Sequence, residues 1–243
     1  MERDMKYVRP DLAVCYEGTV GRTGPVIYVI DMSGRPFEID DLCAGLAATV
    51  VAIPVEEWDD SLTPWPAPGL YPGDPDFAGD ADRTLKELLD MALPVVDDHF
   101  GLVPSQRAIC GYSLAGLFAM YAFVHSDTFA AAGCLSASVW YEGWLDHLRS
   151  LPLELSGKFA FLSIGSQERE APEKILHRVQ DNMEACAGIL HQAGCETRFE
   201  VGPGNHMQYA RERFIAGLGA IDAFYSSKVA QQSPAGKTRQ HHR

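Results

Sequence analysis

Short runs of apolar residues recur along the chain and predict the strands of a buried sheet. The clearest run is Val-Ile-Tyr-Val-Ile at residues 26–30, which is followed by Asp31. A continuous apolar run of this length is typical of a strand buried on both faces of a parallel sheet. The same pattern predicts further strands at residues 11–16, 49–53 (ending before Pro54), 107–110, 131–135, 159–164 and 197–201.

Longer segments between these runs carry apolar residues at helical spacing. Helices are predicted over residues 85–96, with a kink at Pro94, and over residues 114–124. Pro172 is predicted to open another helix that ends at Gly194, and a last helix is predicted over residues 208–225. The alternation of strand and helix predicts an α/β fold, a mostly parallel, doubly wound sheet flanked by helices.

The length of 243 residues suits one domain, because doubly wound domains of this size commonly stay undivided. We therefore predict a single domain over residues 1–225. Residues 226–243 are rich in Ser, Gln, Pro, Gly, Lys and Arg without a core pattern, and are predicted to form a disordered polar tail.

Acidic residues outnumber basic ones, with 33 Asp and Glu against 20 Lys and Arg. Such a surface repels phosphate backbones and anionic lipids, so neither a nucleic-acid nor a membrane partner is expected. No apolar signal segment opens the chain, and the six cysteines lack metal-binding spacing. A cytoplasmic protein with reduced thiols is the resulting expectation, and a homo-oligomer is compatible with the sequence.

The most specific motif is Gly111-Tyr112-Ser113-Leu114-Ala115, between a predicted strand and an apolar helix. This is the G-x-S-x-G nucleophile elbow in its strand-turn-helix setting, with Ala115 in place of the second glycine. The residues two before and two after the serine must be small, because strand and helix approach closely there. The motif predicts Ser113 as a nucleophile; the alternative is a glycine-rich turn with an incidental serine.

A serine hydroxyl needs a base, and His206 is the predicted one. It lies in a loop rich in Gly and Pro directly after the last predicted strand, where a hydrolase of this topology carries its histidine. The other seven histidines fall in or beside helical segments or in the tail, and are interpreted as structural or surface residues.

The acid that orients His206 is expected between the serine and the histidine in the chain, after the penultimate strand. Glu168 is the first candidate there, and Glu170 and Glu173 are its rivals. Acidic residues that open a helix commonly have no catalytic role, because they complement the positive end of the helix dipole. A dyad without an essential acid is a further alternative.

Two backbone amides are expected to stabilise the oxyanion that forms when an ester carbonyl is attacked. One is that of Leu114, directly after the nucleophile, and the other is assigned to Met32 in the loop after the strand at 26–30. That loop lacks an HGGG motif, so an ordinary Asp-Met-Ser-Gly turn is nearly as good an interpretation.

Aromatic residues in three loops are candidates for binding a small-molecule ester substrate, because loops at strand ends line the pockets of such folds. The alternative is that their rings cover the core. No nucleotide-binding or metal-ligand motif is evident, so neither a cofactor nor a metal is expected. The candidate substrate-binding residues are Trp58, Trp65, Tyr112, Trp140 and Tyr141.

Several of these segments together resemble the α/β-hydrolase superfamily, in the branch of enterochelin-type trilactone esterases and esterase D-like enzymes. The segments are CGYSLAGLFA at 110–119, WDD at 58–60, TPWPAP at 63–68, SASVWY at 136–141, SIGSQE at 163–168 and PGNH at 203–206. The resemblance implies an α/β-hydrolase fold and carboxylester hydrolysis by Ser113 and His206 without metal or cofactor. It leaves the substrate open, and only a short stretch separates Ser138 from Ser156, so no large lid domain is expected.

A serine esterase is thus the predicted function. An acyltransferase or peptidase would use the same residues with another acceptor or bond. A catalytically inactive binding protein, in which the elbow only shapes a pocket, is the non-enzymatic alternative.

Overall fold

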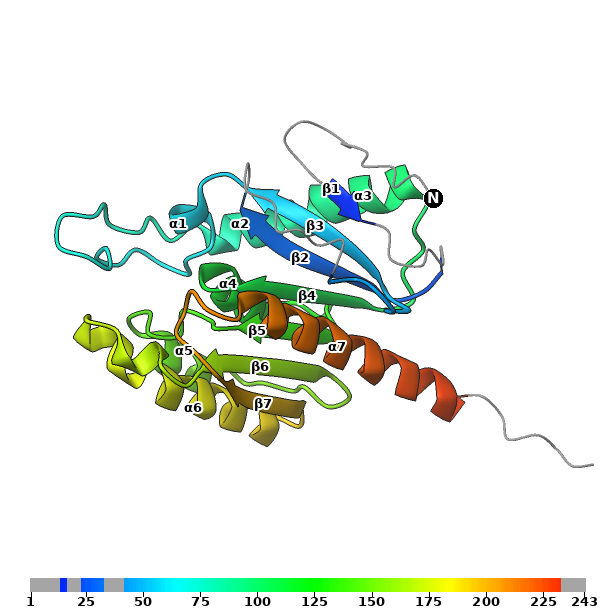
Figure 1. The fold of residues 1–243 in the computed structure, drawn as a ribbon. Coiled ribbons are helices and arrows are strands. Elements are labelled where there is room, and N and C mark those ends of the chain that lie inside the picture. The colour runs from blue at the N-terminus through cyan, green and yellow to red at the C-terminus, as the bar shows by residue number, and fades with distance from the viewer. Residues whose placement is uncertain (1–13, 17–22, 33–41, 233–243) are drawn as a thin grey trace, which may run out of the picture.

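A seven-stranded sheet forms the centre of the molecule in the computed structural model, which describes residues 14–16, 23–32 and 42–232. Its order is β1-β3-β2-β4-β5-β6-β7, and β1 alone is antiparallel to its neighbour. Figure 1 shows the sheet with its helices. The strands are β1 Val14–Tyr16, β2 Val26–Met32, β3 Thr49–Val55, β4 Arg107–Tyr112, β5 Ala131–Leu135, β6 Phe159–Gly165 and β7 Glu196–Gly202.

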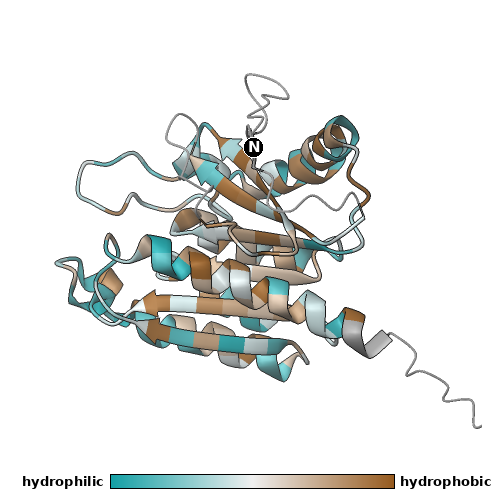
Figure 2. Cartoon of the chain, turned by 45° about the vertical axis from the view of Figure 1, so that its right-hand side comes forward, coloured by the Kyte–Doolittle hydropathy of each residue, from teal (hydrophilic) through white to brown (hydrophobic). Residues whose placement is uncertain are grey.

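Alternate residues of each central strand enter two separate cores. In β2, Tyr28 and Ile30 face one core, while Ile27 and Val29 face the other, as the two-residue period of a strand requires. Apolar residues therefore dominate the central strands in Figure 2, whereas β7, at the sheet edge, is largely hydrophilic.

Helices cover both faces of the sheet. Figure 1 shows α7 across one face, where it packs on β4, β5 and β6, and α4 and α6 on the other. The α-helices are α1 Trp58–Ser61, α2 Ala81–Glu87, α3 Leu93–Phe100, α4 Leu114–His125, α5 Trp144–Ser150, α6 Val179–Gln192 and α7 Ala210–Gln232. This arrangement confirms the predicted mostly parallel, doubly wound sheet.

Two differences from the predicted elements lie near prolines. Strand β3 runs past Pro54, which a strand tolerates at its end. The helix predicted over 85–96 is divided by the π-helical turn η2 (Leu88–Ala92), and Pro94 lies in the first turn of α3. A proline is accommodated there because the first-turn N–H of a helix has no intrahelical acceptor.

The prediction that a helix opens at Pro172 was wrong, because α6 begins at Val179. The intervening chain forms the short 3-10 helix η4 (Lys174–Arg178). At the other end, α7 continues through residues 226–232, which the sequence assigned to a disordered tail. This stretch contains no Gly or Pro before Pro234, so nothing local stops the helix earlier. Residues 233–243 lie outside the described part.

All six parallel strands end on the same side of the sheet, where the arrowheads point in Figure 1. The loops after β3, β4, β5, β6 and β7 therefore meet at one edge, and side chains far apart in sequence come together there.

Candidate active site

Ser113 occupies a strained turn between β4 and α4. Its φ is 61° and its ψ is −124°, which places a non-glycine residue in a region that L-residues rarely adopt. A Cβ added at Gly111 would lie 2.2 Å from the carbonyl oxygen of Ala115, so only glycine fits there. The turn thus has the geometry of a nucleophile elbow, and Ala115 in place of the second glycine is accommodated.

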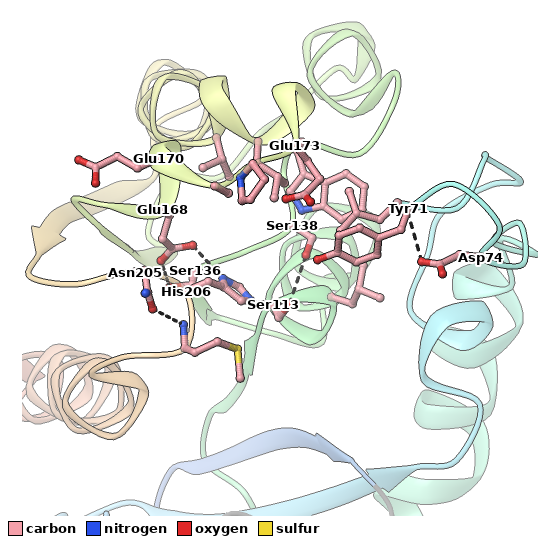
Figure 3. Close-up of a pocket in the computed structure, with 18 of the residues that line it drawn as sticks. Tyr71, Asp74, Ser113, Ser136, Ser138, Glu168, Glu170, Glu173, Asn205 and His206 are labelled. Carbon is pink, nitrogen blue, oxygen red and sulfur yellow. Dashed lines mark hydrogen bonds and ion pairs between the residues drawn. The ribbon is translucent and has the colours of Figure 1, made fainter.

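His206 lies in the loop between β7 and α7 and faces Ser113. Its Nε2 is 3.0 Å from Ser113 Oγ, and its Nδ1 is 2.8 Å from Glu168 Oε2. The serine, the imidazole and the carboxylate therefore form one continuous hydrogen-bonded chain across the ends of three strands (Figure 3). With the Nδ1 proton directed to the carboxylate, Nε2 is free to accept the serine proton.

Glu168 begins the short 3-10 helix η3 (Glu168–Glu170) after β6 and is buried. Its Oε1 accepts hydrogen bonds from Ser136 Oγ at 2.6 Å and from the Gly165 amide at 2.8 Å. Burial acts to raise the pKa of Glu168, but the hydrogen bonds from His206, Ser136 and Gly165 outweigh it, and the pKa lies below its usual value. The carboxylate is thus held in its charged form.

The two rival acids take other positions. Glu170 and Glu173 line the cavity beside the serine, and neither forms a hydrogen bond or an ion pair with His206 in the described part of the chain. Of the three candidates raised by the sequence, Glu168 alone contacts the histidine.

A second layer of side chains holds the His206 loop in place. Tyr112 donates its hydroxyl to the carbonyl oxygen of His206 at 2.7 Å, and Arg213 on α7 donates to the Tyr112 hydroxyl at 2.9 Å. The buried guanidinium also donates to the carbonyl oxygens of Pro203 and Gln208, on the two sides of His206. Helix α7 is thereby bonded to the loop at several points.

The two predicted oxyanion donors differ in their surroundings. Leu114 is the first residue of α4, so its amide has no acceptor within the helix. The residue also lines the cavity. The Met32 amide instead donates to Asp31 Oδ1 at 2.8 Å, and Met32 does not line the cavity. The neighbouring carboxylate thus satisfies the Met32 amide in this structure, and its role as an oxyanion donor stays a prediction. The segment 33–41 lies outside the described residues.

A cavity of about 670 Å³ opens above Ser113 and His206. Trp58 and Trp140 line it as predicted, and Tyr71 and Phe77 add two further rings that the sequence analysis did not single out. Tyr71 and Phe77 lie in the loop between α1 and α2. The sequence of this loop shows scattered turn residues and no pattern that predicts its path, which depends on tertiary contacts.

Three other predicted substrate-binding aromatics do not line this cavity. The Tyr112 hydroxyl donates a hydrogen bond to the His206 carbonyl. The rings of Trp65 and Tyr141 pack edge to face with their centroids 6.1 Å apart. Trp65 donates its indole N–H to the Glu142 carbonyl, and Tyr141 donates its hydroxyl to the Trp65 carbonyl. These two rings join the loop after α1 to the chain before α5, which favours the interpretation as structural rings for them.

Two serines after β5 were also missed as site residues. Ser136 has a positive φ of 42° and bonds Glu168, and Ser138 Oγ lies 3.4 Å from Ser113 Oγ. The segment SASVWY contained both, but its spacing does not reveal which atoms face the triad.

Within residues 14–16, 23–32 and 42–232, no cluster of three or more His, Cys, Asp or Glu side chains could hold a metal ion. Over the same part of the chain, no helix combines the length and apolar character needed to cross a bilayer.

Comparisons with known proteins extend this picture. Residues 3–221 match the family model Esterase, described as "Putative esterase". In sequence the chain is similar to the protein YbbA of Bacillus subtilis (strain 168), at 27% identity over 177 residues, covering 70% of this chain and 71% of YbbA.

In structure the chain is similar to an IroE-like serine hydrolase from Shewanella oneidensis, with a TM-score of 0.67, 19% identity, and coverage of 83% of this chain and 71% of that one. It is also similar to the siderophore hydrolase EstA from Aspergillus nidulans, with a TM-score of 0.62, 18% identity and 84% of each chain covered. At these identities the structural matches show a shared fold, and they confirm the predicted α/β-hydrolase fold.

Proposed function

Because this chain belongs to the Esterase family and is a carboxylic ester hydrolase, we propose that it acts through an acyl-enzyme on Ser113. His206 is the general base and acid, and Glu168 orients it. The observation that carries this proposal is the hydrogen-bonded chain from Ser113 Oγ through His206 to Glu168 Oε2, with distances of 3.0 and 2.8 Å.

In the first half of the reaction, Ser113 Oγ attacks the ester carbonyl carbon while its proton passes to His206 Nε2. The carbonyl oxygen becomes an oxyanion that accepts a hydrogen bond from the Leu114 amide. As the tetrahedral intermediate collapses, the bond to the leaving oxygen breaks, and that oxygen takes the proton from Nε2. The alcohol leaves, and the acyl group remains on Ser113.

In the second half, water replaces the alcohol. His206 Nε2 takes a proton from the water as its oxygen attacks the acyl carbon, and it then returns the proton to Ser113 Oγ as the acid departs. Throughout, the buried charge of Glu168 stabilises the imidazolium that forms in each half, which supports its role as the third member of the triad.

The test compares hydrolysis of p-nitrophenyl acetate and butyrate by the wild type, Ser113→Ala and Ser138→Ala. We expect Ser113→Ala to lose turnover and labelling by a fluorophosphonate probe, since the probe reacts only with an activated serine. Ser138→Ala should keep the labelling, because no histidine is bonded to Ser138 in the described part of the chain. Labelling that disappears in Ser138→Ala and survives in Ser113→Ala would overturn the assignment.

A further inference from the structure

The cavity above Ser113 is lined by several acidic residues. Beyond Glu168, four acidic residues contribute to its lining, Asp59, Asp74, Glu170 and Glu173, and none of its described lining residues is Lys or Arg. Lys174 follows Glu173 in the chain, but it does not line the cavity. The serine and histidine already define this cavity as a site, so these carboxylates describe the chemistry of its walls.

The Glu173 side chain extends toward Ser138 in Figure 3. Asp74 lies beyond Tyr71 as seen from Ser113, and the carboxylate of Glu170, although that residue contributes to the lining, is directed away from Ser113. The side chains of Glu173 and Asp59 form no hydrogen bond or ion pair with any described residue, and Asp74 accepts a hydrogen bond from the Tyr71 amide at 3.2 Å.

Neighbouring carboxylates act on Asp59 in addition to its burial. Burial raises the pKa of the Asp59 carboxyl above its usual value, and the negative charges of Asp60 and Asp74 add to the rise. A cation placed among these carboxylates would relieve the repulsion, whereas an anion would add to it.

Aromatic rings share the same wall. Trp58, Tyr71, Phe77 and Trp140 line the cavity, and the rings of Phe77 and Trp140 lie 6.2 Å apart. The face of an aromatic ring attracts a cation, most strongly where the cation is partly desolvated. Rings and carboxylates in one wall together favour an alkylammonium group over an apolar group of equal size.

The position of His206 indicates which part of the ester meets this wall. The leaving oxygen must lie within hydrogen-bonding reach of His206 Nε2 to be protonated. In Figure 3, Tyr71 lies on the other side of Ser113 from His206, and Glu173 lies beyond Ser138. The acyl group, which points away from the leaving oxygen, therefore extends toward them.

Building on the proposed acyl-enzyme mechanism, we propose that this enzyme selects esters whose acyl group carries a positively charged ammonium group, held by Glu173, Asp59 and Asp74 against the rings of Trp58 and Tyr71. The segment 33–41, outside the described residues, contains one basic residue against three acidic ones, so its composition adds no net positive charge.

The test uses two p-nitrophenyl esters of the same shape and leaving group. One carries γ-trimethylammoniobutyrate, and in the other a tert-butyl group replaces the trimethylammonium. Rates of the Ser113→Ala protein are subtracted as background. We expect kcat/KM to favour the cationic ester by about tenfold at low ionic strength, from one cation–π contact and one partly exposed ion pair. The advantage should shrink as salt is added.

Glu173→Gln should reduce this preference to about threefold or less, since it removes a carboxylate whose side chain extends toward Ser138 in Figure 3. Glu154→Gln removes the same charge at an exposed position outside the cavity and should leave the preference intact. Equal kcat/KM values for the two esters, or a preference that Glu173→Gln and Glu154→Gln change alike, would overturn the inference while the esterase assignment stands. Hydrolysis of both esters that survives in Ser113→Ala would instead overturn the proposed mechanism and this inference with it.

Discussion

The replacement Glu168→Gln tests the proposed triad because it changes one carboxylate oxygen into an amide nitrogen with little change in shape. In the wild-type protein, Glu168 Oε1 accepts hydrogen bonds from Ser136 Oγ and the Gly165 amide, and Glu168 Oε2 lies 2.8 Å from His206 Nδ1. The glutamine must keep its oxygen toward the first two groups, because its NH2 would meet the Gly165 amide donor to donor. Its NH2 then donates to Nδ1, and the imidazole proton moves to Nε2.

An imidazole protonated on Nε2 cannot accept the proton of Ser113, so the nucleophile loses its base. An equivalent change of tautomer in a serine protease lowers kcat about 10⁴-fold, which corresponds to about 5.4 kcal/mol of transition-state stabilisation. We expect kcat of Glu168→Gln on p-nitrophenyl acetate to fall by about 10³ to 10⁴. Near-ultraviolet circular dichroism should show native packing in the variant.

Glu170→Gln is the matched control, because it removes the same charge from a carboxylate that is directed away from Ser113 and His206 in Figure 3. Its kcat should stay within about threefold of the wild-type value. The reasoning is refuted by a Glu168→Gln enzyme that keeps more than about one tenth of wild-type kcat. A larger loss in Glu170→Gln than in Glu168→Gln would refute it equally.

Three further predictions concern stability. Arg213→Met should lower the free energy of unfolding by about 3–5 kcal/mol, because the buried guanidinium donates to three oxygen atoms. Urea denaturation checks this against the control Arg149→Met, which loses only an exposed ion pair; an equal loss of stability in the two variants would contradict it. Gly111→Ala should destabilise the protein by about 3 kcal/mol or more, since its Cβ would lie 2.2 Å from a carbonyl oxygen. Gly188→Ala, on α6 with open space around the new Cβ, should be neutral or stabilise by up to about 1 kcal/mol, and similar melting temperatures for the two would argue against the steric account. Because the pKa of Glu168 is lowered in the folded protein, its charge contributes stability that is complete above the ordinary glutamate value of 4.5 and is lost as the pH falls below it. The difference in unfolding free energy between the wild type and Glu168→Gln should therefore shrink on acidification. A difference that stays constant with pH would contradict the lowered pKa.

The elbow and the histidine could be predicted because their signals are local. The strained turn at Ser113 requires small neighbours that appear side by side in the chain, and His206 follows a strand whose apolar pattern is readable. The choice among Glu168, Glu170 and Glu173 could not be made in this way. All three lie near one strand end, and the direction of each side chain depends on the path of η3 and on the donors that meet it.

The aromatic residues show the same limit from another side. The sequence placed Trp58 and Trp65 in one loop and gave no reason to separate them. In the folded protein Trp58 lines the cavity, whereas Trp65 donates to the Glu142 carbonyl and packs on Tyr141. A partner distant in the chain is recognised only once both segments are placed in space.

Patterns along the chain were enough to predict the sheet, its buried strands, and Ser113 and His206 as the proposed nucleophile and base. Strand burial and the steric demands of a tight turn act on neighbouring residues, so their signals are local. Contacts across the molecule set the acid, the cavity wall and the buried Arg213 that holds the His206 loop. These contacts form where the ends of the parallel strands lie close together. Residues far apart in sequence meet there, and no periodic pattern in the sequence indicates which of them will meet. The same convergence collects carboxylates and rings from separate loops into one wall, and so gives the cavity a charge that no single segment reveals.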